Sequence, residues 1–167
     1  MKLNVEKNIL LKSLSHVQGI VEKRNTLPVL SNILLEAKEN SLILSATDMD
    51  ISITDKLNCN ILEEGSTTVS AQTLYDIIRK LPDSAEIEII SNDGKLISLR
   101  AGKSKFSLGC LPKEDFPIIE IGDLENELNI DSQIFLKLIN KTRFAGSNEE
   151  TRYFLNGIYL HYKNYNN

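Results

Sequence analysis

Cysteine is scarce in this sequence, and long apolar runs are lacking. The two cysteines, Cys59 and Cys110, stand far apart without CxxC spacing, which excludes a disulfide framework and a cysteine-based structural zinc site. We expect two free thiols in a reducing cytoplasm. No run approaches the ~20 apolar residues of a membrane helix, and the N-terminal MKLNVEKN lacks the apolar region of a secretory signal. The sequence therefore predicts a cytoplasmic protein with no membrane partner.

Motifs that carry catalysis are also lacking. The sequence has no glycine-rich phosphate loop, no nucleophile elbow and no HExxH. His16 and His161 have no sequence neighbours that would complete a metal site, so both are predicted to be solvated or structural. Asp48 and Asp50 leave two alternatives open: they can hold Mg²⁺ for phosphoryl transfer, or they can form a turn between two strands. We expect the turn, and with it no catalytic residue, metal or cofactor.

The charge balance is acidic. The chain has 167 residues, of which 41% are hydrophobic, as in an ordinary globular protein. This length exceeds what a single average domain needs but is short for two. Lysine and arginine number 19 against 23 aspartates and glutamates, for a formal net charge of −4. Such a balance argues against a general nucleic-acid coat but is compatible with a locally basic surface.

Residues 2–110 form two similar series of short segments. Amphipathic helices are expected at 7–21 and 71–81, where apolar residues recur with a period of 3.6. Glu39-Asn40 and Asn92-Asp93-Gly94 supply hairpin turns. Strands are expected at Lys2–Val5, Asn32–Ala37, Ser41–Ala46, Ile51–Leu57, Ser66–Ser70, Glu86–Ser91, Lys95–Ala101 and Ser104–Cys110. The order strand–helix–strand–strand–strand thus occurs twice, which predicts an α+β fold with helices packed on antiparallel sheets.

An internal repeat follows the segment Leu111–Pro117, whose two prolines indicate a linker. Leu3–Leu14 aligns with Leu128–Ile139 at an offset of 128 − 3 = 125 residues. The same offset carries the next strand onto Ile158 and Leu160. Agreement of both segments at one offset, without a gap, favours duplication of a whole domain.

The repeat divides the chain into a first domain at residues 1–120 and the start of a second at residues 121–167. The third predicted helix lies in the second domain, after a first strand near Leu128. Its inward residues are predicted to be Ile134, Phe135, Leu138 and Ile139. It would be cut off after its second strand, near Leu160, which leaves a sheet edge unpaired. We therefore expect this chain to be the front part of a longer protein.

The outward faces of the three predicted helices share a basic character. They carry Lys12, Arg79, Lys80, Lys137 and Lys141. Asp76 is the only acidic residue among the outward positions, and most carboxylates fall in strands and turns. On one helix such lysines are usually just solvated, but the same bias on three helices of an acidic chain favours a contact surface. Lysine and arginine without stacking aromatics suit contacts with duplex DNA phosphates that do not read sequence.

Four ordered blocks of residues carry a family resemblance. The blocks are Thr26–Leu35, Ala46–Asp50, Ser104–Pro117 and Arg152–Gly157. They resemble the bacterial sliding clamps, the β subunit of DNA polymerase III, and the resemblance covers essentially the whole chain. It implies a DNA clamp fold with three similar domains per subunit and a head-to-tail homodimer that closes a ring around duplex DNA. It also implies a non-catalytic processivity factor that binds DNA polymerase and clamp-loader subunits.

The resemblance assigns roles to individual positions. Arg24 matches a loop arginine that touches DNA in the family. The first-domain edge that pairs with the neighbouring subunit is matched by Lys103, Lys105, Phe106 and Leu108. The start of the pocket that accepts short peptide motifs of polymerases and the clamp loader is matched by Arg152, Phe154 and Leu155. By residue type alone, Phe154 and Leu155 would be interpreted as core residues. The segment from Lys103 to Leu108 would be interpreted as an ordinary core strand with a basic rim.

Two departures from the family pattern limit these expectations. Glu149 stands where a related clamp has a glutamine that approaches DNA, so the resemblance carries no DNA contact to this position. The rest of the second domain and the whole third domain lie outside the sequence. We therefore expect that this chain alone neither closes a ring nor binds partners as the family does. A metal-dependent enzyme using Asp48 and Asp50, and a β-rich interaction module that does not bind DNA, stay open as alternatives.

Overall fold

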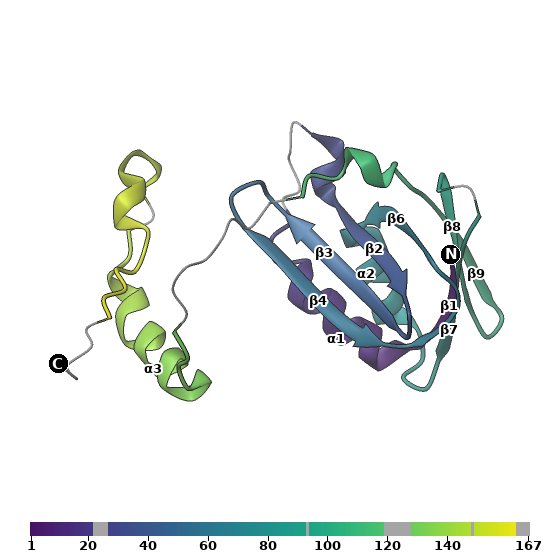
Figure 1. Cartoon of the computed structure of the whole chain (residues 1–167), viewed down its shortest axis with the longest axis horizontal. Coiled ribbons are helices and arrows are strands. Elements are labelled where there is room, and N and C mark those ends of the chain that lie inside the picture. Colours follow the sequence, from purple (N-terminus) through teal and green to yellow (C-terminus); the bar gives the residue numbers. More distant parts are fainter. Residues whose placement is uncertain (22–26, 93, 119–127, 148, 163–167) are drawn as a thin grey trace. The chain divides into compact units, whose positions relative to one another are not determined.

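The structure is a computed structural model of the whole chain and describes residues 1–21, 27–92, 94–118, 128–147 and 149–162 (Figure 1). The chain divides into two compact units, Met1–Glu120 and Ile121–Asn167, and each is described by itself. Within the residues described, every helix is too short or too polar to cross a membrane.

Two antiparallel sheets build the first unit. The five-stranded sheet has the order β5-β1-β7-β8-β9 and the four-stranded sheet the order β4-β3-β2-β6. The strands are β1 Lys2–Glu6, β2 Asn32–Lys38, β3 Ser41–Thr47, β4 Ser52–Asn58, β5 Asn60–Glu63, β6 Gly65–Ser70, β7 Glu86–Ser91, β8 Leu96–Ala101 and β9 Ser104–Gly109. Each strand–helix–strand–strand–strand series lends its first strand to the sheet of the other: β1 pairs with β7, and β6 pairs with β2. The α+β prediction is confirmed, and only β5 was not predicted.

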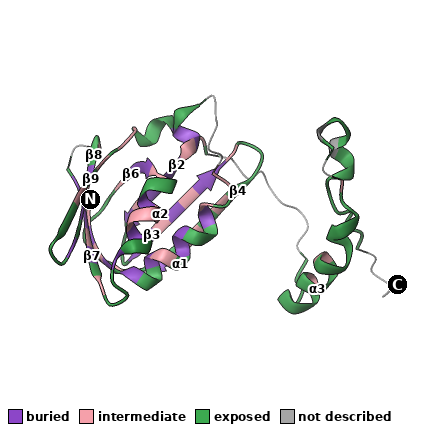
Figure 2. Ribbon diagram, turned by 180° about the vertical axis from the view of Figure 1, so that it is seen from behind, coloured by how far each residue is buried: buried purple, intermediate pink, exposed green. Residues whose placement is uncertain are grey.

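The helices α1 Lys7–Val17 and α2 Ala71–Lys80 cover one face of the four-stranded sheet (Figure 2). They contact each other, α1 lies against β3 and β4, and α2 lies against β2 and β6. Both begin where the sequence predicts, but α1 ends at Val17 instead of residue 21. Gly19 stands two residues after Val17, and glycine is a poor helix former because its backbone is the most costly to order.

The core joins both sheets and both helices. Its largest fully buried side chains are Leu3, Leu10, Leu14, Ile33, Leu35, Leu42, Leu44, Leu74, Ile78, Ile87, Ile89 and Ile97. They come from alternate strand positions and from the 3.6-residue stripe of each helix, as the sequence pattern predicts. Complete burial of so many aliphatic side chains supplies the main stabilising term of this unit.

A second, smaller cluster covers the opposite face of the four-stranded sheet. It comprises Val29, Leu30, Leu34 and Phe116. The Thr68 hydroxyl donates to the Leu111 carbonyl at 2.8 Å and accepts from the Leu111 amide at 3.1 Å. The two prolines of segment 111–117 predicted a linker, but this segment is attached to the first unit. Phe116 is only 6% exposed and packs in the smaller cluster.

The second unit contains the helix α3, Ser132–Thr142, and two short 3₁₀ segments. The bounds of α3 equal those of α1 shifted by the predicted offset, since 132 − 7 = 125 and 142 − 17 = 125. The Asp131 carboxylate caps the helix by accepting from the amides of Gln133 and Ile134, both at 3.0 Å. The helical part of the repeat is thus present in the structure.

The strands of the predicted repeat do not form. Residues 128–130 and 158–160 have no regular secondary structure. β1 and β2 are held by β5, β7, β3 and β6. At the 125-residue offset, β5, β6 and β7 fall at 185 and above, outside the 167 residues. A strand forms its backbone hydrogen bonds with neighbouring strands, so strand-forming residue types alone do not make one.

The predicted inward face of α3 is likewise uncovered. Ile134 and Leu138 are 56% and 50% exposed, and Phe135 and Ile139 are only half-buried. The described residues of the second unit include no buried side chain. The amphipathic pattern predicted the helix correctly, but a helix buries its apolar stripe only where another layer packs against it.

Candidate functional site

Three of the predicted DNA-binding cations lie on one side of the first unit. Lys12 is exposed on α1, and Arg79 and Lys80 are exposed in the last turn of α2. Because both helices lie on the same face of the four-stranded sheet, their outward sides face the same direction (Figure 2). Asp76 is the only acidic residue of α1 and α2, and it pairs with Arg79. The helices therefore present a cationic face, which we call the helix face.

Arg79 is held by its own helix. Its guanidinium lies 3.4 Å from the Asp76 carboxylate and 5.7 Å from the centre of the Tyr75 ring. The Asp76 carboxylate also accepts a hydrogen bond from the side-chain amide of Gln72 at 2.7 Å. An exposed pair of this kind contributes little to stability. It orients the guanidinium, while Lys80 has the more mobile charge.

The other three predicted DNA contacts belong to other parts of the chain. Lys137 and Lys141 are exposed on α3, in the second unit. Arg24 lies outside the residues that the structure describes. Within the first unit, the structure places Lys12, Arg79 and Lys80 on one face of the four-stranded sheet.

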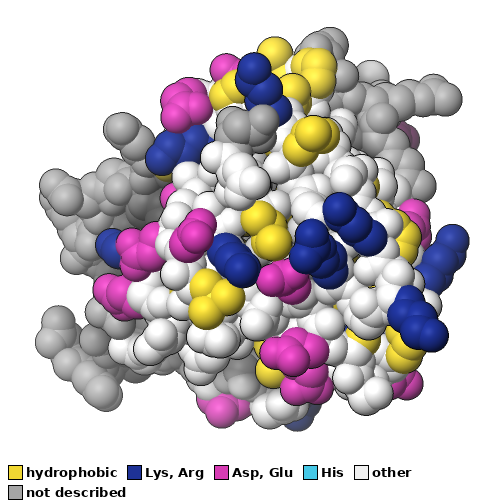
Figure 3. All heavy atoms as spheres, turned by 90° about the vertical axis from the view of Figure 1, so that its right-hand side faces the viewer, with side chains coloured by type: hydrophobic (Ala, Val, Ile, Leu, Met, Phe, Trp, Pro, Cys, Tyr) yellow, Lys and Arg dark blue, Asp and Glu magenta, His cyan; other side chains and the backbone are white. Residues whose placement is uncertain are grey.

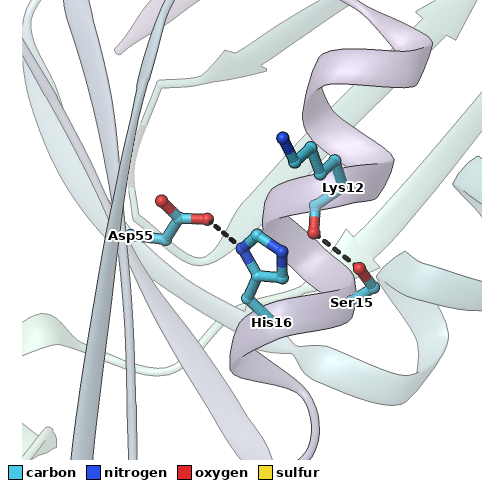
Figure 4. A network of polar contacts seen from close by, with 4 residues as sticks. All are labelled: Lys12, Ser15, His16 and Asp55. Carbon is cyan, nitrogen blue, oxygen red and sulfur yellow. Dashed lines mark hydrogen bonds and ion pairs between the residues drawn. The ribbon is translucent and has the colours of Figure 1, made fainter. Parts of the chain in front are cut away.

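A histidine and an aspartate face each other beside Lys12 (Figure 4). His16 Nδ1 lies 2.8 Å from Asp55 Oδ2, which joins α1 to the edge strand β4. Burial works against ionisation of Asp55. The hydrogen bonds from His16 and Ser13, the charge of His16 and the Lys56 amide outweigh burial, so the pKa of Asp55 lies below its ordinary value.

Sequence reasoning placed His16 on the wet face of α1 and missed Asp55. A signal for it exists in the sequence of β4. Asp55 alternates with Ile53 and Leu57, so a carboxylate stands on the face that otherwise packs on the core. A charged residue on an apolar strand face needs a partner, and the partner comes from the helix above it.

The predicted subunit edge lies on β9, the last strand of the five-stranded sheet. Among the strands that the structure describes, β9 pairs with β8 alone, so its other edge is open to a further strand. Phe106 and Leu108 are half-buried and pack against the core, while Lys103 and Lys105 are exposed. The four residues therefore share one strand and its turn, with apolar side chains inward and cations outward.

The outer surface of the five-stranded sheet has mixed charge. Figure 3 shows lysine and arginine interspersed with aspartate and glutamate on the side of the unit where this sheet lies. Glu88 forms ion pairs with Lys2 at 3.7 Å and with Arg100 at 3.6 Å. The charges of Lys2 and Arg100 are thus compensated by a neighbouring carboxylate.

Asp48 and Asp50 form a turn, as expected. Asp48 Oδ1 accepts from the amides of Asp50 at 3.0 Å and Ile51 at 2.7 Å. This bonding fixes the β3–β4 hairpin, in which Met49 has a φ of 83°. Among the described residues, no group of three or more His, Cys, Asp or Glu side chains is placed to hold a metal. The Asp48 carboxylate and the Asp50 amide thus stabilise the turn between β3 and β4.

The predicted peptide-pocket residues lie in the second unit. Phe154 and Leu155 are 70% and 44% exposed. Arg152 Nε lies 3.6 Å from Glu149 Oε2, with both side chains largely exposed. Glu149, the position that departs from the family pattern, therefore has a cationic neighbour in its own loop. The unit as it stands places these residues on its surface.

The two cysteines and His161 are the remaining residues that the sequence singled out as possible metal ligands or reactive groups. Cys59 and Cys110 are free thiols, as predicted, and burial raises the pKa of Cys59. His161 Nδ1 lies 3.4 Å from the Tyr159 hydroxyl on an exposed segment. Within the part of the chain that the structure describes, neither the thiols nor His161 belong to a metal-binding group.

Two strand–helix–strand–strand–strand series with paired helices on one sheet face define a DNA-clamp domain. The chain belongs to the family described as DNA polymerase III beta subunit, N-terminal domain, which matches residues 1–120. The chain is 48% identical to the beta sliding clamp of Caulobacter vibrioides over 162 residues, 96% of this chain and 44% of that protein. The beta sliding clamp of Rickettsia felis is 41% identical over 163 residues, 98% of this chain and 43% of that protein.

Solved structures agree with this assignment. A crystal structure of a beta sliding clamp from C. crescentus superposes with a TM-score of 0.92 at 48% identity, covering 96% of this chain and 43% of that one. A sliding clamp from Bartonella birtlesii gives a TM-score of 0.93 at 43% identity, with 96% and 43% coverage. The chain thus spans less than half the length of the relatives it matches.

Proposed function

We propose that this chain is the N-terminal portion of a DNA sliding clamp, a non-catalytic processivity factor of bacterial DNA replication. In the complete protein, a head-to-tail homodimer encircles duplex DNA and tethers the replicative polymerase to its template. Residues 1–120 form the first clamp domain, and residues 121–167 begin the second. The protein acts in the cytoplasm, where its DNA and polymerase partners reside. The observation that carries this proposal is the cationic helix face on a clamp-family fold.

The helix face binds DNA through phosphates. Lys12, Arg79 and Lys80, with Lys137, Lys141 and Arg24 from other parts of the chain, neutralise backbone charge without reading bases. Such contacts release counterions and weaken steeply as salt rises. They are individually weak and equivalent along the duplex, which permits sliding.

The β9 edge forms the subunit contact. It is open to a further strand, as strand addition requires, and Phe106 and Leu108 supply apolar contacts while Lys103 and Lys105 supply charge. Arg152, Phe154 and Leu155 contribute one wall of a pocket for peptide motifs of the polymerase and the clamp loader. Their large exposed apolar area is consistent with a surface that further protein covers.

Charge reversal on the helix face tests the proposal. We expect Lys12→Glu combined with Lys80→Glu to weaken binding of the chain to a short duplex, measured by fluorescence anisotropy at low salt. The slope of log K against log salt becomes shallower by about 0.9 for each phosphate that the variant no longer neutralises. The matched control is Lys38→Glu. Every one of these substitutions replaces a lysine by a glutamate, so the charge change per substitution is the same.

Lys38 suits this control because it is exposed at the end of β2 on the other sheet face. Leu34 on β2 packs in the Phe116 cluster, and Lys38 follows it by four positions on the same side of the strand. Equal weakening of DNA binding per substitution in the control and in the helix-face variant would show that only net charge matters, and would refute the assignment of the helix face.

A further inference from the structure

The pairing of His16 with Asp55 determines what the imidazole offers to the helix face. An ionised carboxylate only accepts hydrogen bonds, so Nδ1 carries the proton in the 2.8 Å contact with Asp55. In neutral imidazole the other nitrogen, Nε2, is then an acceptor. Protonation turns Nε2 into a donor with positive charge, while the Nδ1 contact is kept.

The position of His16 makes this change relevant to an anion. The His16 side chain is 51% exposed, so Nε2 can meet a ligand. Lys12 lies one helical turn away and on the same side of α1 (Figure 4). Lys12, His16 and Asp55 line the same hollow of about 380 Å³ between α1 and β4. An anion held by Lys12 therefore lies within reach of the imidazole.

Few other charges act on His16. Lys56 also borders the hollow, but it pairs with Ile43, so its side chain belongs to the opposite sheet face from Asp55. The neighbouring elements β1, β3 and α2 contribute no titratable side chain to the hollow within the described part of the chain. β3 has no titratable residue at all. The local balance is set by Lys12 and Asp55.

We propose that His16 is a proton-dependent DNA phosphate contact, oriented by Asp55, that adds to Lys12 on the helix face. At low pH His16 and Lys12 bind neighbouring phosphates together. At high pH the imidazole presents a lone pair to the phosphate and withdraws from binding. Asp55 is a positioning residue: it fixes the ring and its tautomer without touching DNA. This inference rests on the proposed DNA-binding function and specifies how that surface is regulated.

The test compares DNA affinity at about pH 6 and about pH 8, two values between which histidine ordinarily loses most of its positive charge. The probe is a short fluorescent duplex at constant ionic strength. We expect roughly two- to fivefold tighter binding at the lower pH, the size of one exposed ion pair. The salt slope should be steeper there by about 0.9, because one more phosphate is neutralised.

Two variants separate His16 from every other titrating group. His16→Gln should bind as the unsubstituted chain does at the higher pH and should lose the pH dependence. His161→Gln is the matched control, because these two are the only histidines in the sequence. It should keep the pH dependence. Equal binding at both pH values, or a dependence that His16→Gln retains, overturns the proposal while leaving DNA binding by the helix face intact.

A second measurement does not depend on DNA. Nitrogen NMR of the His16 ring should show the Nδ1–H tautomer at the higher pH, and Asp55→Asn should lose this preference because an amide both donates and accepts. A neutral Nε2–H tautomer overturns the proposal whatever the affinities are. Absence of DNA binding at both pH values, with the expected tautomer present, overturns both this inference and the proposed function of the helix face.

Discussion

The repeated helices α1 and α3 allow one substitution to be compared in two environments. Leu14 on α1 and Ile139 on α3 occupy equivalent positions, since 139 − 14 = 125. Leu14 is 0% exposed in the core that joins α1 to the sheets, whereas Ile139 is half-buried in a unit without buried side chains among its described residues. We predict that Leu14→Ala destabilises the chain strongly and that Ile139→Ala does not.

The magnitude follows from burial. Truncation of a fully buried leucine removes its transfer free energy and leaves a cavity, which together amount to about 2–5 kcal/mol. A value of about 3 kcal/mol is a large part of the total stability of a domain. For Ile139→Ala we expect about 0.5 kcal/mol or less, because the side chain already contacts water and no cavity forms.

Urea unfolding followed by circular dichroism measures both changes. With a slope of about 2 kcal/mol per molar urea, Leu14→Ala lowers the midpoint by roughly 1.5 M, and Ile139→Ala shifts it by less than about 0.3 M. Equal shifts for the two variants would refute the reasoning, because they would mean that α3 is buried as α1 is.

Three further predictions concern polar groups. Asp48→Ala removes both acceptor bonds of the β3–β4 turn and should lower the unfolding free energy by about 1–2 kcal/mol, whereas added Mg²⁺ should leave the melting temperature unchanged. Because the folded pKa of Asp55 lies below its ordinary value of 3.8, its ionised form stabilises the fold above that pH. This contribution is lost as pH falls through the folded pKa, so the unsubstituted chain should lose more stability on acidification than Asp55→Asn, measured by urea midpoints. Burial raises the pKa of Cys59, so in a Cys110→Ser background its thiol should react with a disulfide reagent more slowly than free glutathione.

The local sequence pattern was sufficient to predict which segments form helices and strands and which side of each is buried. The 3.6-residue stripe of Leu10, Leu14 and Val17 predicted which side of α1 is buried. Strand alternation and turn residues predicted eight of the nine strands within a residue or two. The omitted strand, β5, has only four residues, and its asparagine and glutamate are uncommon in strands.

Pairing partners were beyond the reach of local pattern. Leu128–Ile130 differs from Leu3–Val5 only by isoleucine in place of valine, yet only the latter is a strand. A strand is stabilised by ladder bonds to neighbouring strands, and β5 and β7 supply them to β1. A helix forms its bonds within itself, and α3 therefore appears at the predicted bounds without a partner.

The sequence by itself determined the helices, including α3 at the repeat offset, and most strands of the first unit, because each depends on residue types at short, fixed spacing. Ordered blocks of residues determined the family. Only the tertiary structure decided that the two series exchange their first strands, that Phe116 is anchored, and that His16 meets Asp55. The last pair is separated by 39 residues and arises where α1 crosses β4. Its chemistry comes from distance and orientation in space, which no sequence spacing encodes.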